Sequence, residues 1–271
     1  MAKRTKKAEA APPVVIEDRR IPLGELLSEK PPMQAISFWI VGDTPLICHA
    51  WSEKAKKEML FKQAKGTKSG KEARDPEGDF VNSLYDMGPA PKQNGKKNGG
   101  RVYGFPLTGI KKAILAVAHK DRGVPRSDVM LALYLDAELV KVSTAHPGAV
   151  CNLPLVRLYG SPPSMREDMV RIGTGLRKVA NLAYRAEFYP WAIRIHGAVN
   201  PAMVAPHALA FLTRQAGLGV GIGDWRNERG GWAGSFHLGS VAEEAAWDKF
   251  AAGRGPLPQP RPRTIDGREA A

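Results

Sequence analysis

Histidine is the residue type in this chain best suited to acid–base chemistry, and His49 is the best-placed example. It stands between a short apolar run and an expected helix, close to Trp51 and Lys54. In that position an imidazole can serve as a general base, or it can stack on a base of a nucleic acid. A histidine that packs or caps at the entrance of a helix gives the same pattern, so His49 is a candidate and not an assignment.

The spacing of ligand-type residues does not indicate metal or cofactor chemistry. The six histidines form no HExxH or HxH motif, and the two cysteines, Cys48 and Cys151, have no metal-site spacing. Glu167 and Asp168 are adjacent, so their side chains are expected to point in different directions, which argues against a two-metal nuclease site. We expect no metal, no cofactor and, apart from the open case of His49, no catalysis.

Residues 217–236, GLGVGIGDWRNERGGWAGSF, are the most unusual stretch of the chain. An apolar segment precedes this glycine-rich segment and a strand-like run follows it, which predicts a structured loop between a helix and a strand. Closely spaced glycines permit left-handed backbone conformations and close approach of a ligand or a second chain. The glycines expected to form the loop are Gly219, Gly221, Gly223, Gly230, Gly231 and Gly234.

Aromatic and cationic side chains within and outside this segment suit a phosphate backbone with stacked bases. We expect a nucleic-acid surface from Trp51, Lys54, Arg166, Arg171, Lys178, Arg185, Trp225, Arg226, Arg229 and Trp232. Two alternatives remain open. The glycine-rich segment would also suit a tight connection with arginines that only aid solubility, and Arg166 and Arg171 would also suit ion pairs with the carboxylates between them.

Length and charge limit the classes of protein to consider. A chain of 271 residues with 43% hydrophobic content can bury a substantial core. The formal net charge of +13 predicts attraction to polyanions, of which nucleic acid is the commonest. No apolar run approaches the roughly 18 residues that span a bilayer. With two cysteines and no secretory signal, we expect a soluble protein of a reducing compartment.

Hydrophobic periodicity predicts the elements that must position these residues. We expect a basic arm over residues 1–34, one domain over 35–250 with a basic insertion at about 65–101, and a tail rich in proline and arginine over 251–271. The expected strands are 35–41, 138–142, 182–188, 191–199 and 235–241, and the expected helices are 53–64, 108–119, 201–216 and 243–250. Residues 143–165 are rich in proline, and we expect them to form a loop.

Without the insertion, the order of elements is β-α-β-β-α-β. That order is typical of the ferredoxin-like, RRM-like α+β arrangement, in which helices cover one face of an antiparallel sheet. The other face stays free, and nucleic-acid-binding modules of this shape use it.

The pattern GIGDWRNERGGWAGSFHL, between a helix and a final strand, resembles the glycine-rich loop of the CRISPR-associated RAMP superfamily. The stretches DTPLICHAWSEKAKKEM, SMREDMVRIG and GVGIGDWRNERGG are similar to an uncharacterised family of bacteriophage proteins. The family-like stretches cover roughly residues 35–241, and no obvious second RAMP domain is present. The resemblance implies an RRM-like fold that binds RNA and either assembles along the strand or, as in the processing nucleases, cuts RNA with a histidine.

These observations predict a non-enzymatic protein of phage type that binds single-stranded RNA or DNA and assembles as a homo-oligomer along the strand. The first alternative is an RNA-cleaving RAMP-like endoribonuclease that uses His49. The second is a phage structural or assembly protein whose basic tails touch packaged genome. No membrane partner is expected.

Overall fold

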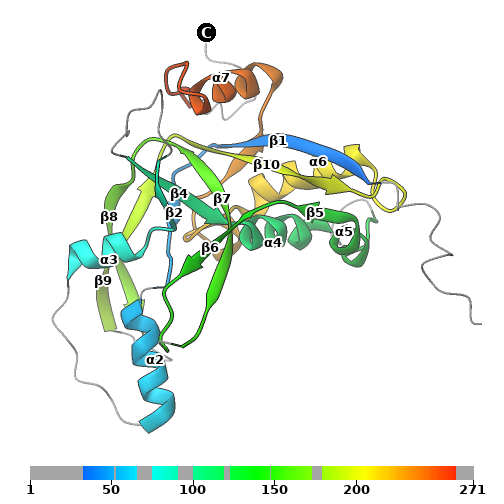
Figure 1. The fold of residues 1–271 in the computed structure, drawn as a ribbon. Helices are drawn as coiled ribbons and strands as arrows, with labels where there is room; N and C mark the ends of the chain where they lie inside the picture. Colours follow the sequence, from blue (N-terminus) through cyan, green and yellow to red (C-terminus); the bar gives the residue numbers. More distant parts are fainter. Residues whose placement is uncertain are drawn as a thin grey trace, which may run out of the picture. The chain divides into compact units, whose positions relative to one another are not determined.

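The fold is built on an antiparallel sheet whose central strands are β1 (Gln34–Gly42) and β10 (Trp191–Val199) (Figure 1). The computed structural model describes residues 33–51, 53–65, 75–90, 100–118, 123–146, 148–172 and 179–260. Residues 1–32 of the expected arm and 261–271 of the expected tail lie outside these ranges.

Within the described residues the strand order of the main sheet is β11-β1-β10-β7-β4-β3. In addition, β5 pairs with β10 and β6 pairs with β7. The remaining strands of this main sheet are β3 (Asp86–Pro89), β4 (Arg101–Pro106), β5 (Leu133–Leu135), β6 (Glu138–Val142), β7 (Cys151–Gly160) and β11 (Phe236–Leu238).

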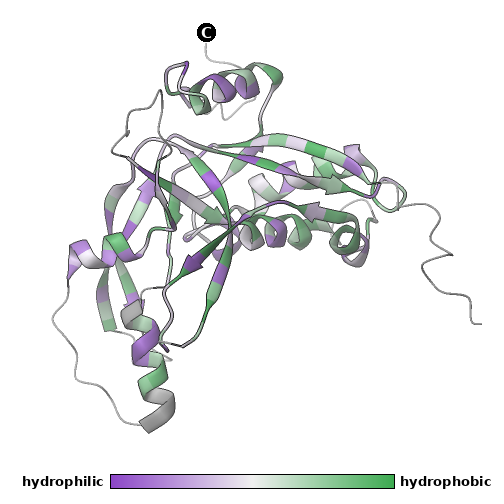
Figure 2. Ribbon diagram, in the orientation of Figure 1, coloured by the Kyte–Doolittle hydropathy of each residue, from purple (hydrophilic) through white to green (hydrophobic). Residues whose placement is uncertain are grey.

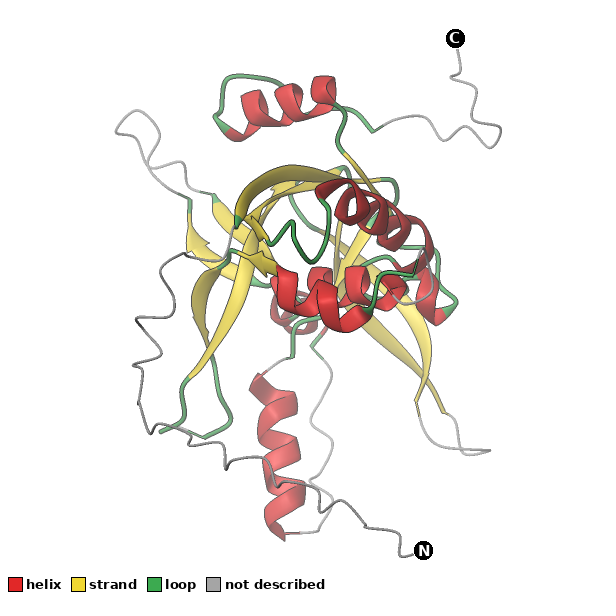
Figure 3. Cartoon of the chain, turned by 90° about the vertical axis from the view of Figure 1, so that its right-hand side faces the viewer, coloured by secondary structure: helices red, strands yellow, loops and turns green. Residues whose placement is uncertain are grey.

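Helices α4 (Leu107–Ala118) and α6 (Pro206–Gln215) pack side by side on one face of the main sheet, next to the short α5 (Arg126–Ala132) (Figure 3). The apolar residues of α4 recur at helical spacing, so they form one face, and most of them are buried. In Figure 2 the hydrophobic residues of this helix are green and its hydrophilic residues are purple. Ile110 and Ile114 of α4 are fully buried, as are Ile193 and Ile195 of β10. This layer is the main hydrophobic core.

The opposite face of the main sheet is covered in part by α7 (Val241–Ala251) (Figure 1). The rings of Trp39 on β1 and Trp247 on α7 are stacked, with centroids 6.1 Å apart, and such a pair contributes about 0.5–1.5 kcal/mol beyond its buried area. The indole nitrogen of Trp39 also donates to the Asp248 carboxylate at 3.1 Å. The face that the sequence predicts to be free is therefore occupied at this end.

A smaller sheet consists of β2 (Leu46–Cys48), β9 (Val179–Phe188) and β8 (Ser164–Ile172), in the order β2-β9-β8. Helix α3 (Pro76–Asn82) packs against β9, and α2 (Glu53–Lys65) extends away from both sheets (Figure 1). The prediction of a loop at 143–165 is wrong for β7, and β8 was not expected at all. The expected insertion at 65–101 contains α3 and β3, and β3 is part of the main sheet.

The failed prediction at β7 has a physical explanation. Leu155, Val156 and Leu158 are buried, because β7 pairs with β4 and β10 over these residues. Pro154 is tolerated because β7 pairs only with β6 at that point, and the pairing with β4 begins at Leu155. A residue without an N–H group can occupy such an open edge. Burial and pairing therefore outweigh the low strand propensity of proline here.

No helix among the described residues is long and apolar enough to cross a membrane.

An ionic network joins β11, the β1–β2 turn and the start of α7. His237 Nδ1 lies 2.7 Å from Asp43 Oδ1, and its Nε2 lies 3.1 Å from Glu243 Oε1. Burial disfavours the charged ring, but the hydrogen bonds and charges of Asp43 and then Glu243 outweigh it and raise the pKa of His237 above 6.5. Burial also acts to raise the pKa of Glu243, but hydrogen bonds from Ser240 and His237 outweigh it and lower this pKa below 4.5.

We expect this network to make stability depend on pH. The contribution of His237 is fully present below its unfolded pKa of 6.5 and is lost as pH rises through its raised folded pKa. The contribution of Glu243 is present above 4.5 and is lost as pH falls through its lowered folded pKa. His237→Gln should therefore cost about 1.5–3 kcal/mol at about pH 6, and less at about pH 9. Urea unfolding at both pH values measures this. His207→Gln, at an exposed position of α6, is the control, and an equal cost of His237→Gln at both pH values would contradict the network.

Candidate functional site

The glycine-rich segment folds into a packed loop, not a flexible connection. It continues α6 as one wide helical turn, η1 (Ala216–Val220), and then turns sharply at Gly221 and Gly223, whose φ angles are +73° and +82°. Left-handed angles of this kind favour glycine. At Gly223 the approach to β2 also requires glycine, because a Cβ atom there would lie 2.6 Å from the carbonyl oxygen of Ile47.

The second half of the loop is fixed by hydrogen bonds to its surroundings. It contains a single 3-10 turn, η2 (Asn227–Arg229). The side-chain amide of Asn227 donates to the Leu218 carbonyl at 2.8 Å and to the Ser235 hydroxyl at 3.2 Å. The Gly234 N–H donates to the Pro45 carbonyl at 2.8 Å. These bonds join both ends of the loop to each other and to the β1–β2 turn, so the side chains between them are held in place.

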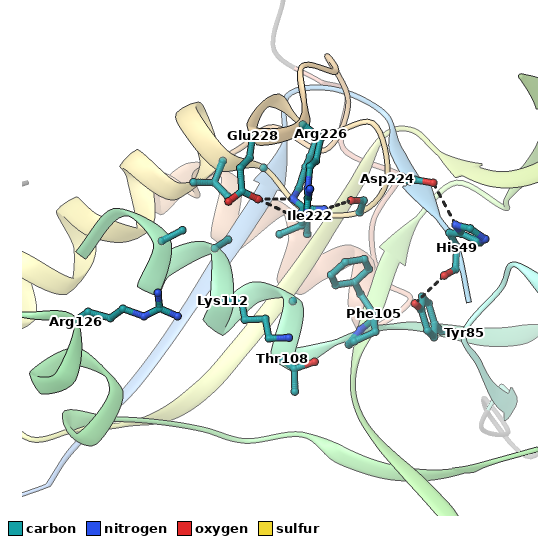
Figure 4. Close-up of a pocket in the computed structure, with 18 residues that line it drawn as sticks. His49, Tyr85, Phe105, Thr108, Lys112, Arg126, Ile222, Asp224, Arg226 and Glu228 are labelled. Carbon is teal, nitrogen blue, oxygen red and sulfur yellow. Dashed lines mark hydrogen bonds and ion pairs between the residues drawn. The ribbon is translucent and has the colours of Figure 1, made fainter. Parts of the chain in front are cut away.

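A cavity of about 610 Å³ lies between this loop and α4 (Figure 4). Helix α4 lines it with Thr108 and Lys112, spaced by one helical turn, while the loop lines it with residues 220–224 and with Arg226, Glu228 and Arg229. Arg126 closes one end, and His49 with Tyr85 closes the other. The volume is within the range of about 300–1,000 Å³ that is usual for ligand sites.

Cations in this cavity differ in how they are paired. Among the described residues, no carboxylate lies within ion-pair distance of Lys112, Arg126 or Arg229, and all three are exposed. Arg226, by contrast, forms an ion pair with Glu228 at 2.9 Å and donates to the Gly223 carbonyl at 3.3 Å. The cavity therefore offers three positive side chains that are available to an anion, and a fourth that fixes the loop.

His49 is paired with a carboxylate of the loop. Its Nδ1 lies 3.3 Å from Asp224 Oδ2, and the same oxygen lies 3.2 Å from Arg185 of β9. The hydrogen bond from His49 lowers the pKa of Asp224, burial opposes this, and the charge of Arg185 lowers the pKa further, so Asp224 stays ionised. An ionised partner at Nδ1 orients the imidazole and leaves Nε2 to act on a ligand.

Tyr85 supports His49 from the backbone side, because its hydroxyl donates to the His49 carbonyl at 3.2 Å (Figure 4). Burial raises the pKa of Tyr85 to about 12, with smaller contributions from Cys48 and Asp224. The phenol is therefore a hydrogen-bond donor at neutral pH and not a base.

Arg166 is engaged in a structural cluster. It bonds to Asp168 at 2.9 Å and to Glu187 at 2.8 Å, and its guanidinium carbon lies 5.3 Å from the ring centroid of Trp232. Of the two roles that the sequence left open for Arg166, the structure therefore favours the ion pair. The cluster fixes the glycine-rich segment to the β8–β9 hairpin, and Trp232 remains 47% exposed.

The other predicted residues are only partly brought together. Trp225 is 36% exposed on the loop, beside Asp224. Trp51 is 59% exposed, and together with His49 it lines a second cavity. Arg171 is exposed on β8 and lines neither cavity. Lys178 and the side chain of Lys54 lie outside the described residues. Gly219 belongs to η1 and lacks the positive φ that the loop glycines Gly221, Gly223, Gly230 and Gly234 share.

Three important residues were missed by the sequence reasoning. The sequence does contain a pattern from which Lys112 could have been predicted as a site residue. Lys112 lies four residues after Thr108, on the polar side of an otherwise apolar helix. Arg126 begins a short helix, and nothing near it in the sequence connects it with the loop. Asp224 stands beside Trp225 in the glycine-rich segment, but its pairing with His49 depends on residues 175 positions apart coming together.

Among the described residues, no group of three or more His, Cys, Asp or Glu side chains lies close enough to hold a metal ion.

A comparison with known protein families finds no match for this chain, and a search of curated proteins finds none either.

Proposed function

We propose that this protein binds single-stranded nucleic acid, RNA or DNA, with the phosphate backbone in the cavity between the glycine-rich segment and α4. The observation that carries the proposal is a set of three cations around one cavity, Lys112, Arg126 and Arg229, for which the described part of the chain provides no carboxylate partner. Phosphate contacts from lysine and arginine supply most of the affinity in sequence-independent binding. The net charge of +13 adds long-range attraction for a polyanion.

Exposed tryptophans favour a single strand over a small anion or a duplex. Trp51, Trp225 and Trp232 are 59%, 36% and 47% exposed. Aromatic rings beside a basic groove are typical of proteins that bind unpaired strands, because only an unpaired base offers its face for stacking. Trp232 is already held by Arg166, so Trp51 and Trp225 are the better candidates for contact with bases.

The proposal includes the fold relationship that the sequence predicts. The order β11-β1-β10-β7 is antiparallel throughout, α4 lies between β1 and β7 in the chain, and α6 lies between β10 and β11. That arrangement supports a split β-α-β core of the ferredoxin-like, RRM-like kind. Together with the resemblance of the glycine-rich segment to RAMP proteins, this core supports assembly of several copies of the protein along the strand. Within the proposal, the resemblance to phage proteins supports a location of this assembly in the cytoplasm of the bacterial host cell.

Binding of a labelled single strand across salt concentrations tests this function. We expect the logarithm of the association constant to fall by about 0.7 per log unit of salt for each phosphate that is neutralised. Fluorescence anisotropy of the full-length protein measures this slope. Absence of binding at low salt, or a flat salt dependence, would overturn the proposal. Ordered oligomers that form equally well without nucleic acid would favour the phage assembly protein instead.

The pairing of His49 with Asp224 favours a second function, metal-independent cleavage of RNA. In this reaction Nε2 of His49 removes the proton of a 2′-hydroxyl, and the 2′-oxygen attacks the neighbouring phosphorus. The bond from phosphorus to the 5′-oxygen then breaks, which leaves a 2′,3′-cyclic phosphate and a 5′-hydroxyl that takes up a proton. Arg185, next to Asp224, places positive charge close to this centre.

Cleavage predicts a result that binding alone does not. Full-length protein with a chelator should cut a bound RNA, and a 2′-deoxy substitution at the cut site should stop the reaction. His49→Ala should slow cleavage by about 100-fold or more, the usual contribution of a general base, while binding is retained. Gel analysis of a labelled RNA measures both. Cleavage that persists in His49→Ala, or that needs a divalent ion, would rule out this mechanism.

A further inference from the structure

A second cavity, of about 440 Å³, shares His49 with the first. His49 lines both cavities, and Arg185, which shares Asp224 with His49, lines the second. A strand whose phosphates lie in the first cavity therefore reaches the second at the same side chain. Because the two cavities share His49, a strand that passes this side chain has one cavity on each part of its path.

Helices α2 and α3 and strands β8 and β9 all contribute residues to the walls of this second cavity. Asp79 and Asn82 of α3 are three residues apart and so lie on one helix face, while Ala55, Glu58 and Met59 line the facing side from α2. Helix α3 is fixed to β9, because the Ser83 hydroxyl accepts from the Ala186 N–H at 2.8 Å and donates to the Phe80 carbonyl at 2.6 Å. The polar wall is therefore held in place.

Charge distinguishes the second cavity from the first. Its lining includes two carboxylates, Glu58 and Asp79, and among the described residues its only lysine or arginine is Arg185, which is paired with Asp224. Such a cavity disfavours a phosphate. It suits an uncharged group that carries N–H donors, because an ionised carboxylate is purely an acceptor and keeps spare lone pairs even when one partner is present.

Two exposed apolar side chains, one aromatic and one a thioether, also line the cavity. Trp51 is 59% exposed and Met59 is 44% exposed, and both line it. An indole face and a thioether give a base a surface to stack on. A lining of apolar side chains with a few polar groups is the usual composition of a site for a small organic ligand.

We propose that this cavity binds one base of the strand and prefers bases with an exocyclic amino group, such as cytosine, over uracil or thymine. The inference rests on the proposed single-strand binding and names the part of the ligand that the protein reads. The amino group donates to Asp79, as carboxylates accept from cytosine N4 in known complexes, and Asn82 contacts the same edge of the base. Stacking on Trp51 holds the ring.

Cytosine and uracil oligonucleotides provide the sharpest test, because they are both pyrimidines and differ at the position that the carboxylate reads. The full-length protein should bind an oligocytidine at least about fivefold more tightly than an oligouridine of equal length at the same salt. Asp79→Ala should bring the ratio close to one, mainly by weakening binding of the oligocytidine. Should that variant fold poorly by circular dichroism, Asn82→Ala on the same helix face should lower the ratio in the same direction.

Lys112→Ala is the matched control, because it should weaken binding of both strands equally and leave their ratio unchanged. Equal affinity of the wild-type protein for the two strands would overturn the base pocket alone, and so would an unchanged ratio in Asp79→Ala and Asn82→Ala. Absence of binding to either strand at low salt would overturn the proposed function, and with it the pocket. The two failures are therefore distinguishable.

Discussion

Gly234→Ala is expected to lower the free energy of unfolding by about 2–6 kcal/mol, the largest effect of any single substitution that we predict on stability. Two causes act together. The φ angle of Gly234 is +69°, a conformation that strains any residue with a Cβ atom. A Cβ atom would also lie 1.7 Å from the backbone oxygen of Ile222, so the loop would have to move. That movement disturbs the hydrogen bond from Ile222 N–H to the Gly234 carbonyl, which is 2.9 Å long.

Gly219→Ala is the matched control in the same segment. Nothing lies within 4 Å of a Cβ atom at Gly219, and its φ angle is not positive. Alanine there should be neutral or should stabilise by up to about 1 kcal/mol, because it restricts the unfolded chain. Urea unfolding of both variants measures the difference. If Gly234→Ala were no less stable than Gly219→Ala, the loop would not be the packed element described above.

Local patterns in the sequence were sufficient for the elements that pack by one regular face. Helix α4 was predicted within one residue at each end, because its apolar residues follow the helical period without interruption. Strand β10 was predicted at its observed bounds, because apolar and polar residues alternate over 193–196 and the pair Tyr189–Pro190 precedes the strand. The structure also confirms the α+β class.

Elements that depend on distant partners could not be predicted in this way. Strand β8 is polar at most positions and is stabilised by pairing with β9 along its whole length, from Ser164 to Ile172. Strand β7 contains Pro154, and proline is typical of loops. Only the structure shows that β7 pairs on one side alone at this residue, which allows a proline in the strand. In both cases the information lies in the pairing of strands and not in the composition of either segment.

In the candidate site, too, local sequence patterns predict some features, whereas contacts between distant residues do not follow from the sequence. The glycine-rich segment was recognised from composition, and the cavity wall that it forms includes Arg226 and Arg229. Composition does not distinguish an arginine that is available from one that is already paired. Arg166 and Arg226 both have carboxylate partners, whereas Lys112, outside any basic cluster, has none among the described residues. Ion pairs between residues distant in the sequence form only in the folded chain, so the sequence alone does not predict which cations are available.

The largest expected effect on binding comes from replacing the three available cations together. The variant Lys112→Ala, Arg126→Ala, Arg229→Ala removes three proposed phosphate contacts, so the salt slope should fall by about 2. At about 0.1 M salt, the same loss should weaken binding of a single strand by roughly 100-fold. All three side chains are exposed, so the melting temperature should hardly change. Anisotropy over a range of salt concentrations and a thermal melt measure these quantities.

A variant with the same change of charge at another surface separates a local site from general attraction. Lys141, Lys249 and Arg254 are exposed and line neither of the two cavities. Replacing all three by alanine lowers the net charge equally, so any effect of total charge is shared by the two variants. Because the control keeps the cavity intact, its salt slope should stay close to that of the wild-type protein. Equal slopes for the two variants would show that the protein attracts the strand by its total charge, and that the cavity beside the glycine-rich segment does not hold the phosphates.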